Sequence, residues 1–270
     1  MMSRITEKFL GQDGKAMIVA MDHGILGAPK GFKNPRETLE KVLVGKPDGI
    51  LVTPNFARTF QDQLNANPQL KLVIRLDIMA TSTLAGVEGG EELQLAFSDV
   101  EEALEVGADA VITLFIYGRK DKSVLLENMK YLSQISKQTH KYNIPHVMEV
   151  PFWGKEIPQD ENEQAVLLEN ACRVAFELGA DIVKTPYLKN RKVFQEITGG
   201  LPIPVLILGG SKISEQEAFQ LVESSLEDGA RGVFFGRNIW QHGNPGLIIK
   251  AFNQLVHNGV TVEEALKILN

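Results

Sequence analysis

The chain has 270 residues, a net charge of −6, 44% hydrophobic and 23% charged residues, and 24 glycines, as expected of a globular enzyme with a large core. Nucleic acid is excluded as the main partner, because phosphate backbones are bound by basic patches and the chain has no long run of Lys and Arg. The single cysteine, Cys172, excludes an intramolecular disulfide and a multi-cysteine metal site.

The N-terminal segment lacks the apolar region of a signal peptide, and no run of apolar residues approaches the ~18 needed to span a membrane. We therefore expect no membrane association and a cytoplasmic location. No linker divides the sequence, so we expect one domain over residues 1–270.

Short runs rich in Val, Ile, Leu or Phe recur along the chain, as in parallel strands that are covered on both faces. There are eight, over residues 16–22, 49–54, 72–78, 110–116, 145–151, 181–186, 204–210 and 232–237. Amphipathic segments predict helices over residues 34–44, 90–109, 122–143, 161–181, 214–231, 244–259 and 262–269. A short helix over residues 3–11 is expected to close one end of the structure.

Three segments in which a predicted helix ends and the next strand begins resemble one another. They are EVGADAVI, ELGADIVK and EDGARGVF, and in each a glycine precedes the new strand. Asn34 and Pro35 have the residue types preferred at the start of a helix. Eight alternating strands and helices predict an α/β fold of the (β/α)8 TIM-barrel type. A doubly wound open sheet is disfavoured, because no GxGxxG motif follows the first strand.

Lys184 lies in the segment ADIVKTPY, at the end of the sixth apolar run. Catalytic groups of a TIM barrel project from the C-terminal ends of its strands. Lysine is seldom fully buried without a partner, and desolvation disfavours its charged form. A partly neutral lysine is a nucleophile for carbonyl groups, as Schiff-base catalysis requires. The alternative is that Lys184 is simply the first solvated residue after the strand.

The seventh and eighth strands end in glycine-containing segments that predict a phosphate site. The seventh ends in Gly209, Gly210 and Ser211, and the eighth in Gly236 and Arg237. Glycines expose backbone N–H groups to an anion, and the loops after these two strands often bind phosphate in this fold. The alternative is that Gly209 and Gly210 only form a tight turn.

Further polar residues fall at the same predicted rim. Asp22 and His23 end the first strand, and Glu149 lies in the fifth. Asp22 is expected to hold the Lys184 amine or move protons, or else to serve as a turn residue. His23 is a candidate for substrate binding or a hydrogen-bonding residue at the rim. Glu149 needs a cationic neighbour, for which Lys184 and Arg75 are the candidates.

The remaining candidates are less informative. Arg75 and Asp77 either pair inside the barrel or meet substrate, and Trp153 and Trp240 either line the mouth or pack internally. We expect no metal, because the histidines are scattered and none forms a tight ligand pair such as HExxH (His23, His140, His146, His242 and His257).

Four motifs together resemble the archaeal-type class I aldolases, also called the DhnA or DeoC/LacD group. They are MDHG, IVKTPY, LGGSK and GRNIWQ, which follow the first, sixth, seventh and eighth strands in that order. The forms KT-x-Y and GRNI-aromatic-Q look closest to the branch with the phospho-autoinducer-2 thiolase, which transfers an acetyl group to coenzyme A. Other members are fructose-1,6-bisphosphate aldolase and an aminodideoxyheptulosonate synthase.

The resemblance implies a role for each matching residue. Lys184 would form the Schiff base and Asp22 would lie beside the imine and the substrate hydroxyls. The phosphate would lie on Gly209, Gly210, Gly236 and Arg237. The archaeal aldolases have a tyrosine after the fifth strand for proton transfer, but Pro151 occupies that place here. Glu149 is the expected substitute, with Tyr117 as the weaker one.

We therefore expect a metal-independent class I aldolase, without a cofactor, that acts on a phosphorylated ketose and releases a product of the dihydroxyacetone phosphate type. The alternatives are acyl transfer to coenzyme A, transaldol chemistry, and a sugar-phosphate-binding barrel without catalysis. The resemblance also implies a homo-oligomer, often of ten subunits, for which helices bearing Trp240 and Phe252 would supply an interface.

Overall fold

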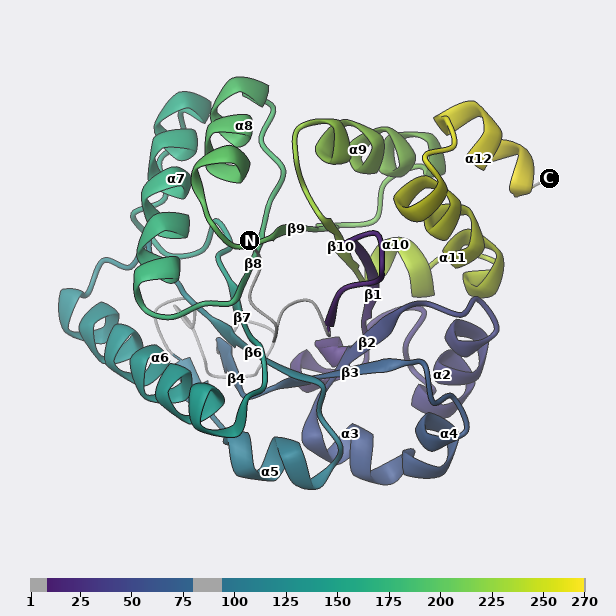
Figure 1. The fold of residues 1–270 in the computed structure, drawn as a ribbon, viewed down its shortest axis with the longest axis horizontal. Helices are drawn as coiled ribbons and strands as arrows, with labels where there is room; N and C mark the ends of the chain where they lie inside the picture. The colour runs from purple at the N-terminus through teal and green to yellow at the C-terminus, as the bar shows by residue number, and fades with distance from the viewer. Residues whose placement is uncertain (1–8, 80–93, 270) are drawn as a thin grey trace.

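The computed structural model describes residues 9–79 and 94–269, and within these ranges eight parallel strands close a barrel surrounded by helices (Figure 1). The strands of the barrel are β1 (Ala16–Ala20), β2 (Gly49–Val52), β3 (Lys71–Arg75), β6 (Ala110–Leu114), β7 (His146–Glu149), β8 (Ile182–Thr185), β9 (Val205–Leu208) and β10 (Gly232–Phe235). Their order around the barrel is β1-β10-β9-β8-β7-β6-β3-β2, and β1 pairs with both β2 and β10. This confirms the predicted TIM-barrel fold.

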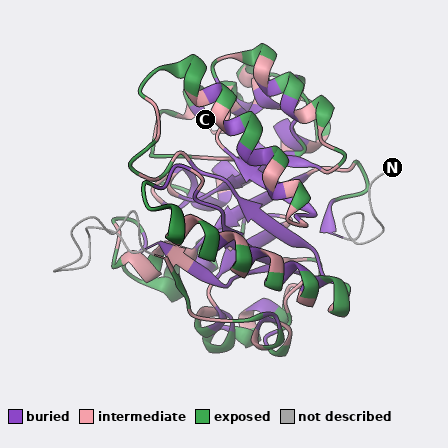
Figure 2. Ribbon diagram, turned by 90° about the vertical axis from the view of Figure 1, so that its left-hand side faces the viewer, coloured by how far each residue is buried: buried purple, intermediate pink, exposed green. Residues whose placement is uncertain are grey.

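The helices lie outside the barrel and cover its strands. They are α2 (Pro35–Leu43), α3 (Pro54–Thr59), α4 (Gln61–Asn65), α5 (Val100–Glu105), α6 (Lys122–Tyr142), α7 (Glu161–Glu177), α8 (Arg191–Gly200), α9 (Glu215–Glu227), α10 (Arg237–Trp240), α11 (Pro245–Asn253) and α12 (Val262–Ile268). Figure 2 shows buried residues along the strands and exposed residues on the outer faces of the helices. Apolar side chains therefore fill both the interior of the barrel and the layer between strands and helices.

Local sequence signals explain where several helices begin and end. The side chain of Asn34 accepts a hydrogen bond from the backbone of Glu37, and Pro35 occupies the first turn of α2. Ser214 and Glu217 form a reciprocal capping box at the start of α9. The glycines of the three similar segments have positive φ angles of 85°, 96° and 95°, at Gly107, Gly179 and Gly229.

The third strand and the helix after it differ from the prediction. The run over residues 72–78 stays in the barrel only to Arg75, and β4 (Asp77–Met79) pairs with β5 (Gln94–Ala96) in a separate antiparallel sheet. The helix predicted over residues 90–109 is wrong at 94–96, and residues 90–93 lie outside the described part. The helix begins only after Asp99, whose side chain accepts a hydrogen bond from the Glu102 backbone.

Four of the described α-helices lie in segments for which no helix was predicted. They are α3, α4, α8 and α10, of six, five, ten and four residues. Short helices present few apolar positions, so their periodicity is a weak signal. Just before β1, Phe9 and Leu10 are buried against side chains of the barrel interior. Residues 3–8 of the helix expected there lie outside the described part.

The expected role of Trp240 and Phe252 in a subunit interface is wrong, because both side chains lie in the core. Trp240 is 3% exposed and donates from Nε1 to the carbonyl oxygen of Ala20 over 3.0 Å. Phe252 is fully buried against the rings of Phe219 and Phe235. The decamer therefore stays a prediction. In the described part of the chain, no helix has both the length and the apolar character to cross a membrane.

Candidate active site

A cavity of about 300 Å³ opens at the C-terminal ends of the barrel strands. It brings together eight of the nine site residues predicted from the sequence, namely Asp22, His23, Glu149, Lys184, Gly209, Gly210, Gly236 and Arg237. The exception is Ser211, which is exposed and does not line this cavity. The prediction that Ser211 binds substrate is therefore not supported by the lining of this cavity.

Lys184 and Glu149 are neighbours in the register of two parallel strands, β8 and β7. Lys184 is only 4% exposed, so it is not a solvated residue after the strand. Its Nζ lies 2.8 Å from Oε1 of Glu149 and 5.3 Å from the centre of the Phe234 ring. The predicted burial of the amine is thus observed, and the structure adds a carboxylate that can exchange a proton with it.

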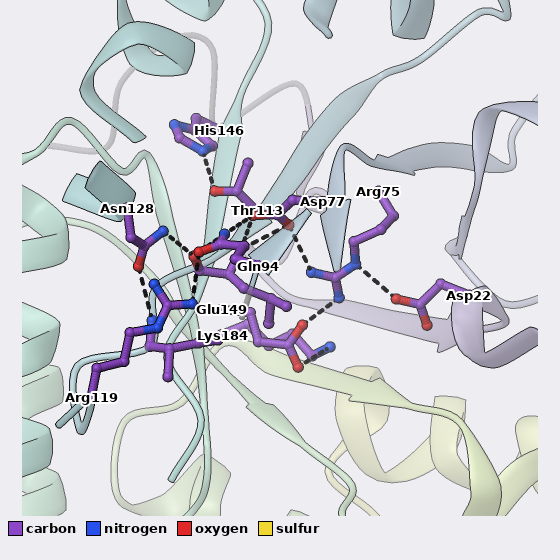
Figure 3. A network of polar contacts seen from close by, with 12 residues as sticks. Asp22, Arg75, Asp77, Gln94, Thr113, Arg119, Asn128, His146, Glu149 and Lys184 are labelled. Atoms are coloured by element: carbon purple, nitrogen blue, oxygen red, sulfur yellow. Dashed lines mark hydrogen bonds and ion pairs between the residues drawn. The ribbon is translucent and has the colours of Figure 1, made fainter. Parts of the chain in front are cut away.

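Arg75, from the end of β3, connects the carboxylates of the site (Figure 3). Its Nε donates to Oδ2 of Asp22 over 2.9 Å, and its Nη2 donates to Oε2 of Glu149. Glu149 therefore has both of the cationic neighbours that the sequence offered as alternatives. The pairing of Arg75 with Asp77 is also present, with Nη1 and Oδ1 3.9 Å apart.

Burial and these charges shift the pKa values of the carboxyl groups in opposite directions. Burial alone would raise the pKa of Glu149, but Lys184 and Arg75 outweigh it and lower that pKa. Burial is likewise outweighed at Asp22, where Arg75 and His23 hold the pKa well below its usual value. At Asp77 burial prevails over Arg75 and raises the pKa to about 7. Glu149 and Asp22 are thus ionised at neutral pH.

The loops after β9 and β10 form the wall of the cavity on the other side of Lys184 from Glu149. Gly210 has a φ angle of +60°, which favours glycine. A Cβ atom at Gly236 would lie 2.9 Å from the carbonyl oxygen of Ala20, so only glycine fits there. Arg237 is half-buried, and among the described residues its Nε has no hydrogen-bond partner. An unused cationic donor beside exposed backbone is suited to an anion.

Asn238 holds this wall in shape, a role that the sequence analysis did not assign. Its side chain is buried and donates from Nδ2 to the carbonyl oxygens of Gly209 over 2.7 Å and Ser211 over 3.3 Å. Its Oδ1 accepts a hydrogen bond from the backbone of Ile213 over 3.0 Å. The signal was its position directly after Gly236 and Arg237 at a strand end.

Gln94, which donates a hydrogen bond to Asp77, is a second residue that the sequence analysis missed. Both Oδ atoms of Asp77 accept from the backbone of Leu114 over 3.0 Å, and Gln94 donates to Asp77 as well. Gln94 Oε1 accepts a hydrogen bond from Arg119 over 3.0 Å. No sequence signal identified Gln94, because it lies in a segment predicted to be helical.

Two other aromatic predictions can now be separated. Trp153 lines the cavity, whereas Trp240 belongs to the core. Pro151 lines the cavity where the aldolases resembled here have a tyrosine, and Tyr117 packs against Phe115 without lining it. Glu149 is therefore the better placed of the two candidates for proton transfer.

Among the described residues, no cluster of three or more His, Cys, Asp or Glu side chains could hold a metal ion.

Comparison with known proteins places this barrel in a family. Residues 16–242 match the model of the DeoC/LacD family aldolases. The chain belongs to the DeoC/LacD family of aldolases. This confirms the resemblance seen in the four motifs, and it makes the protein an enzyme of carbon–carbon bond chemistry. The match spans all eight strands of the barrel.

Individual relatives agree with this assignment over almost the whole chain. An uncharacterized aldolase of Saccharolobus solfataricus is 33% identical, over 99% of this chain and 98% of the relative. The class 1 fructose-bisphosphate aldolase of Thermoproteus tenax is 31% identical, over 99% of this chain and all of the relative. The structure of an archaeal fructose 1,6-bisphosphate aldolase, 27% identical, covers 94% of this chain and 98% of its own with a TM-score of 0.81.

Proposed function

We propose that this DeoC/LacD-family protein is a class I aldolase that forms a Schiff base between Lys184 and a phosphorylated ketose. The observation that carries the proposal is the buried amine of Lys184, 2.8 Å from the Glu149 carboxylate, in the cavity that also contains the glycine-rich wall. A buried ion pair is weak evidence of stabilisation, and strongly perturbed groups in a cleft are typical of catalytic sites. A relative of known structure, 27% identical, is a Schiff-base-forming fructose-1,6-bisphosphate aldolase.

The first step requires a neutral amine. Glu149 accepts a proton from the Lys184 ammonium group, and the freed nitrogen forms a bond to the ketone carbon of the substrate. The carbonyl oxygen takes up one proton from Glu149 and one from the attached nitrogen and leaves as water, so that a protonated imine remains. The substrate phosphate binds the loops of Gly210 and Gly236 with the half-buried Arg237. Binding of this remote group orients the ketone toward Lys184.

The second step breaks a carbon–carbon bond. Glu149, again ionised, removes the proton of the hydroxyl group on the carbon beyond the bond that breaks. The electron pair of that bond moves into the protonated imine and gives an enamine, while the hydroxyl carbon leaves as an aldehyde. The enamine then takes up a proton on carbon, and water releases the ketone product from Lys184. Arg75, itself held by Asp22, lowers the pKa of Glu149 and positions its carboxylate between these proton transfers.

Trapping of the imine tests the proposal directly. Borohydride treatment with dihydroxyacetone phosphate should reduce the imine and attach the ketose carbon skeleton to Lys184, as mapped by peptide mass spectrometry. Lys184→Arg keeps the charge but should abolish the adduct, because guanidinium is not a nucleophile at neutral pH. Lys192→Arg, at an exposed lysine of α8, is the matched control and should label as the wild type does.

Two results would contradict the proposal. One is an adduct on any lysine other than Lys184, and the other is the absence of an adduct with every ketose phosphate tried. Turnover that requires coenzyme A would instead identify acyl transfer as the reaction. Ketose phosphate binding without an adduct would indicate a sugar-phosphate-binding barrel.

A further inference from the structure

The catalytic cavity has two chemically different sides, which lie in opposite directions from Lys184 around the barrel. On one side of β8 come β9 and β10, which carry the glycine-rich wall and Arg237. On the other side come β7, β6 and β3, with β4 directly following β3. A ketose whose phosphate lies on the first side and whose carbonyl reaches Lys184 must extend its remaining carbons toward the second.

The second side is apolar. Its lining consists of the side chains Ile78, Met79, Leu114, Pro151, Phe152 and Trp153. The ionisable groups that accompany them there are Asp77, Glu149 and Arg75, and the guanidinium of Arg75 pairs with carboxylates. Burial raises the pKa of Asp77 to about 7, against the opposing effects of Arg75 and of its hydrogen bonds. A phosphate group on this side would face apolar surface and negative charge.

Among the described residues that line the cavity, the cation on this side is Arg75, and it lies among the carboxyl groups of Asp22, Asp77 and Glu149. Arg75 is bound by Asp22 and Glu149, Lys184 is the nucleophile, and Arg237 lies on the opposite side. Lys155 follows Trp153 by two residues, but it is exposed and does not line the cavity. Residues 80–93 lie outside the described part, and their sequence contains no Lys, Arg or His.

We propose, on the basis of the Schiff-base function above, that the aldehyde half of the substrate is a short aliphatic aldehyde without a phosphate group. Burying a phosphate where the nearby cation is already paired with carboxylates is unfavourable, whereas an alkyl chain gains from leaving water for this apolar surface. The substrate of this aldolase is therefore a ketose monophosphate with an apolar tail. This differs from a ketose bisphosphate, the substrate in the name of the Thermoproteus tenax relative.

Competition between aldehydes in the bond-forming direction tests the inference. The full-length enzyme is supplied with dihydroxyacetone phosphate and either butanal or glyceraldehyde 3-phosphate, and adduct formation is followed by mass spectrometry. We expect kcat/KM for butanal to exceed that for glyceraldehyde 3-phosphate at least tenfold. An equal or higher value for glyceraldehyde 3-phosphate would overturn the inference.

A variant at the apolar side sharpens the test. Trp153 is 37% exposed, so Trp153→Arg places a cation at the rim of this side without burying it. We expect the preference to shift at least tenfold toward glyceraldehyde 3-phosphate. Val166→Arg, at an exposed position of α7, is the control and should leave the preference unchanged. No shift in Trp153→Arg would show that the aldehyde does not lie against this side.

The inference about the aldehyde and the proposed Schiff base are tested by separate experiments, so that one can fail without the other. Borohydride trapping with dihydroxyacetone phosphate alone reports on Lys184 and involves no aldehyde. Trapping together with a preference for glyceraldehyde 3-phosphate would overturn only the inference about the aldehyde. Loss of trapping would overturn the proposed function itself.

Discussion

At the scale of single residues, Glu149 is the centre of the site. Its carboxylate lies between the amine of Lys184 and the guanidinium of Arg75, and these cations lower its pKa against the effect of burial. A base that stays ionised can take protons from the amine and from a substrate hydroxyl. We therefore propose that Glu149 provides the proton transfer for which the aldolases that this chain resembles use a tyrosine.

Replacing this carboxylate tests its role. Glu149→Gln keeps the shape of the side chain but removes the base, so we expect kcat to fall roughly 100- to 10,000-fold, the range typical of general base catalysis. Lys184 remains, so borohydride should still trap an imine after prolonged incubation. Glu161→Gln, at an exposed partner of Lys189, is the control and should keep the wild-type kcat. A kcat within threefold of wild type in Glu149→Gln would assign proton transfer to another group.

At the scale of elements, three similar segments return the chain from a helix to a strand. Each contains a glycine with a positive φ angle, at Gly107, Gly179 and Gly229. The sequence predicted these turns because glycine adopts this backbone conformation without a steric penalty. Their surroundings differ, since an added Cβ would meet open space at Gly107 but would lie 2.8 Å from Cβ of Ser136 at Gly179.

This difference predicts that replacing glycine by alanine destabilises the protein more at Gly179 than at Gly107. Gly107→Ala should lower the free energy of unfolding by about 1–2 kcal/mol, because only backbone strain is added. Gly179→Ala should lower it by about 2–5 kcal/mol, because strain is combined with overpacking against α6. Urea denaturation measures both values. Equal losses in the two variants would show that Ser136 gives way without cost.

At the scale of the whole molecule, the end of the barrel opposite the site is held by an ionic cluster. The two ring nitrogens of His257, in the π-helix Gln254–Asn258, each lie 2.8 Å from a carboxylate, of Asp13 and Asp48. Oδ2 of Asp48 also accepts a hydrogen bond from the backbone of Met17 over 2.6 Å. The cluster joins the C-terminal region to Asp13, just before β1, and to Asp48, just before β2.

The cluster makes stability depend on pH. The hydrogen bond to Asp48 raises the pKa of His257 above its ordinary value of 6.5, against the opposing effect of burial. The stabilisation is complete below pH 6.5 and is lost as the pH rises through the higher pKa of the folded state. At pH 6, His257→Gln should lower the free energy of unfolding by about 1 kcal/mol, and at pH 9 by much less. Urea denaturation at both pH values measures this, and an equal loss at both would contradict the ionic role.

Much of the fold was predictable from the sequence, because local patterns determine it. The apolar runs that form β6, β7, β8, β9 and β10 were recognised, and helices such as α6 begin and end close to the predicted residues. The third strand was predicted too long, because periodicity does not reveal that β4 leaves the barrel to pair with β5. Hydrogen-bond partners far along the chain decide that choice.

The sequence by itself determined the barrel, the family resemblance and the residues whose chemistry matters, above all Lys184. Tertiary structure alone decided how these residues meet. Arg75, Glu149 and Lys184 are far apart in the chain, and only the closure and register of the barrel place their charges in contact. It also decided that Ser211 lies outside the cavity and that apolar side chains line the cavity on the side of β7, β6 and β4. Side-chain contacts across strands depend on the packing of the whole barrel, whereas strands and turns depend on near neighbours in the chain.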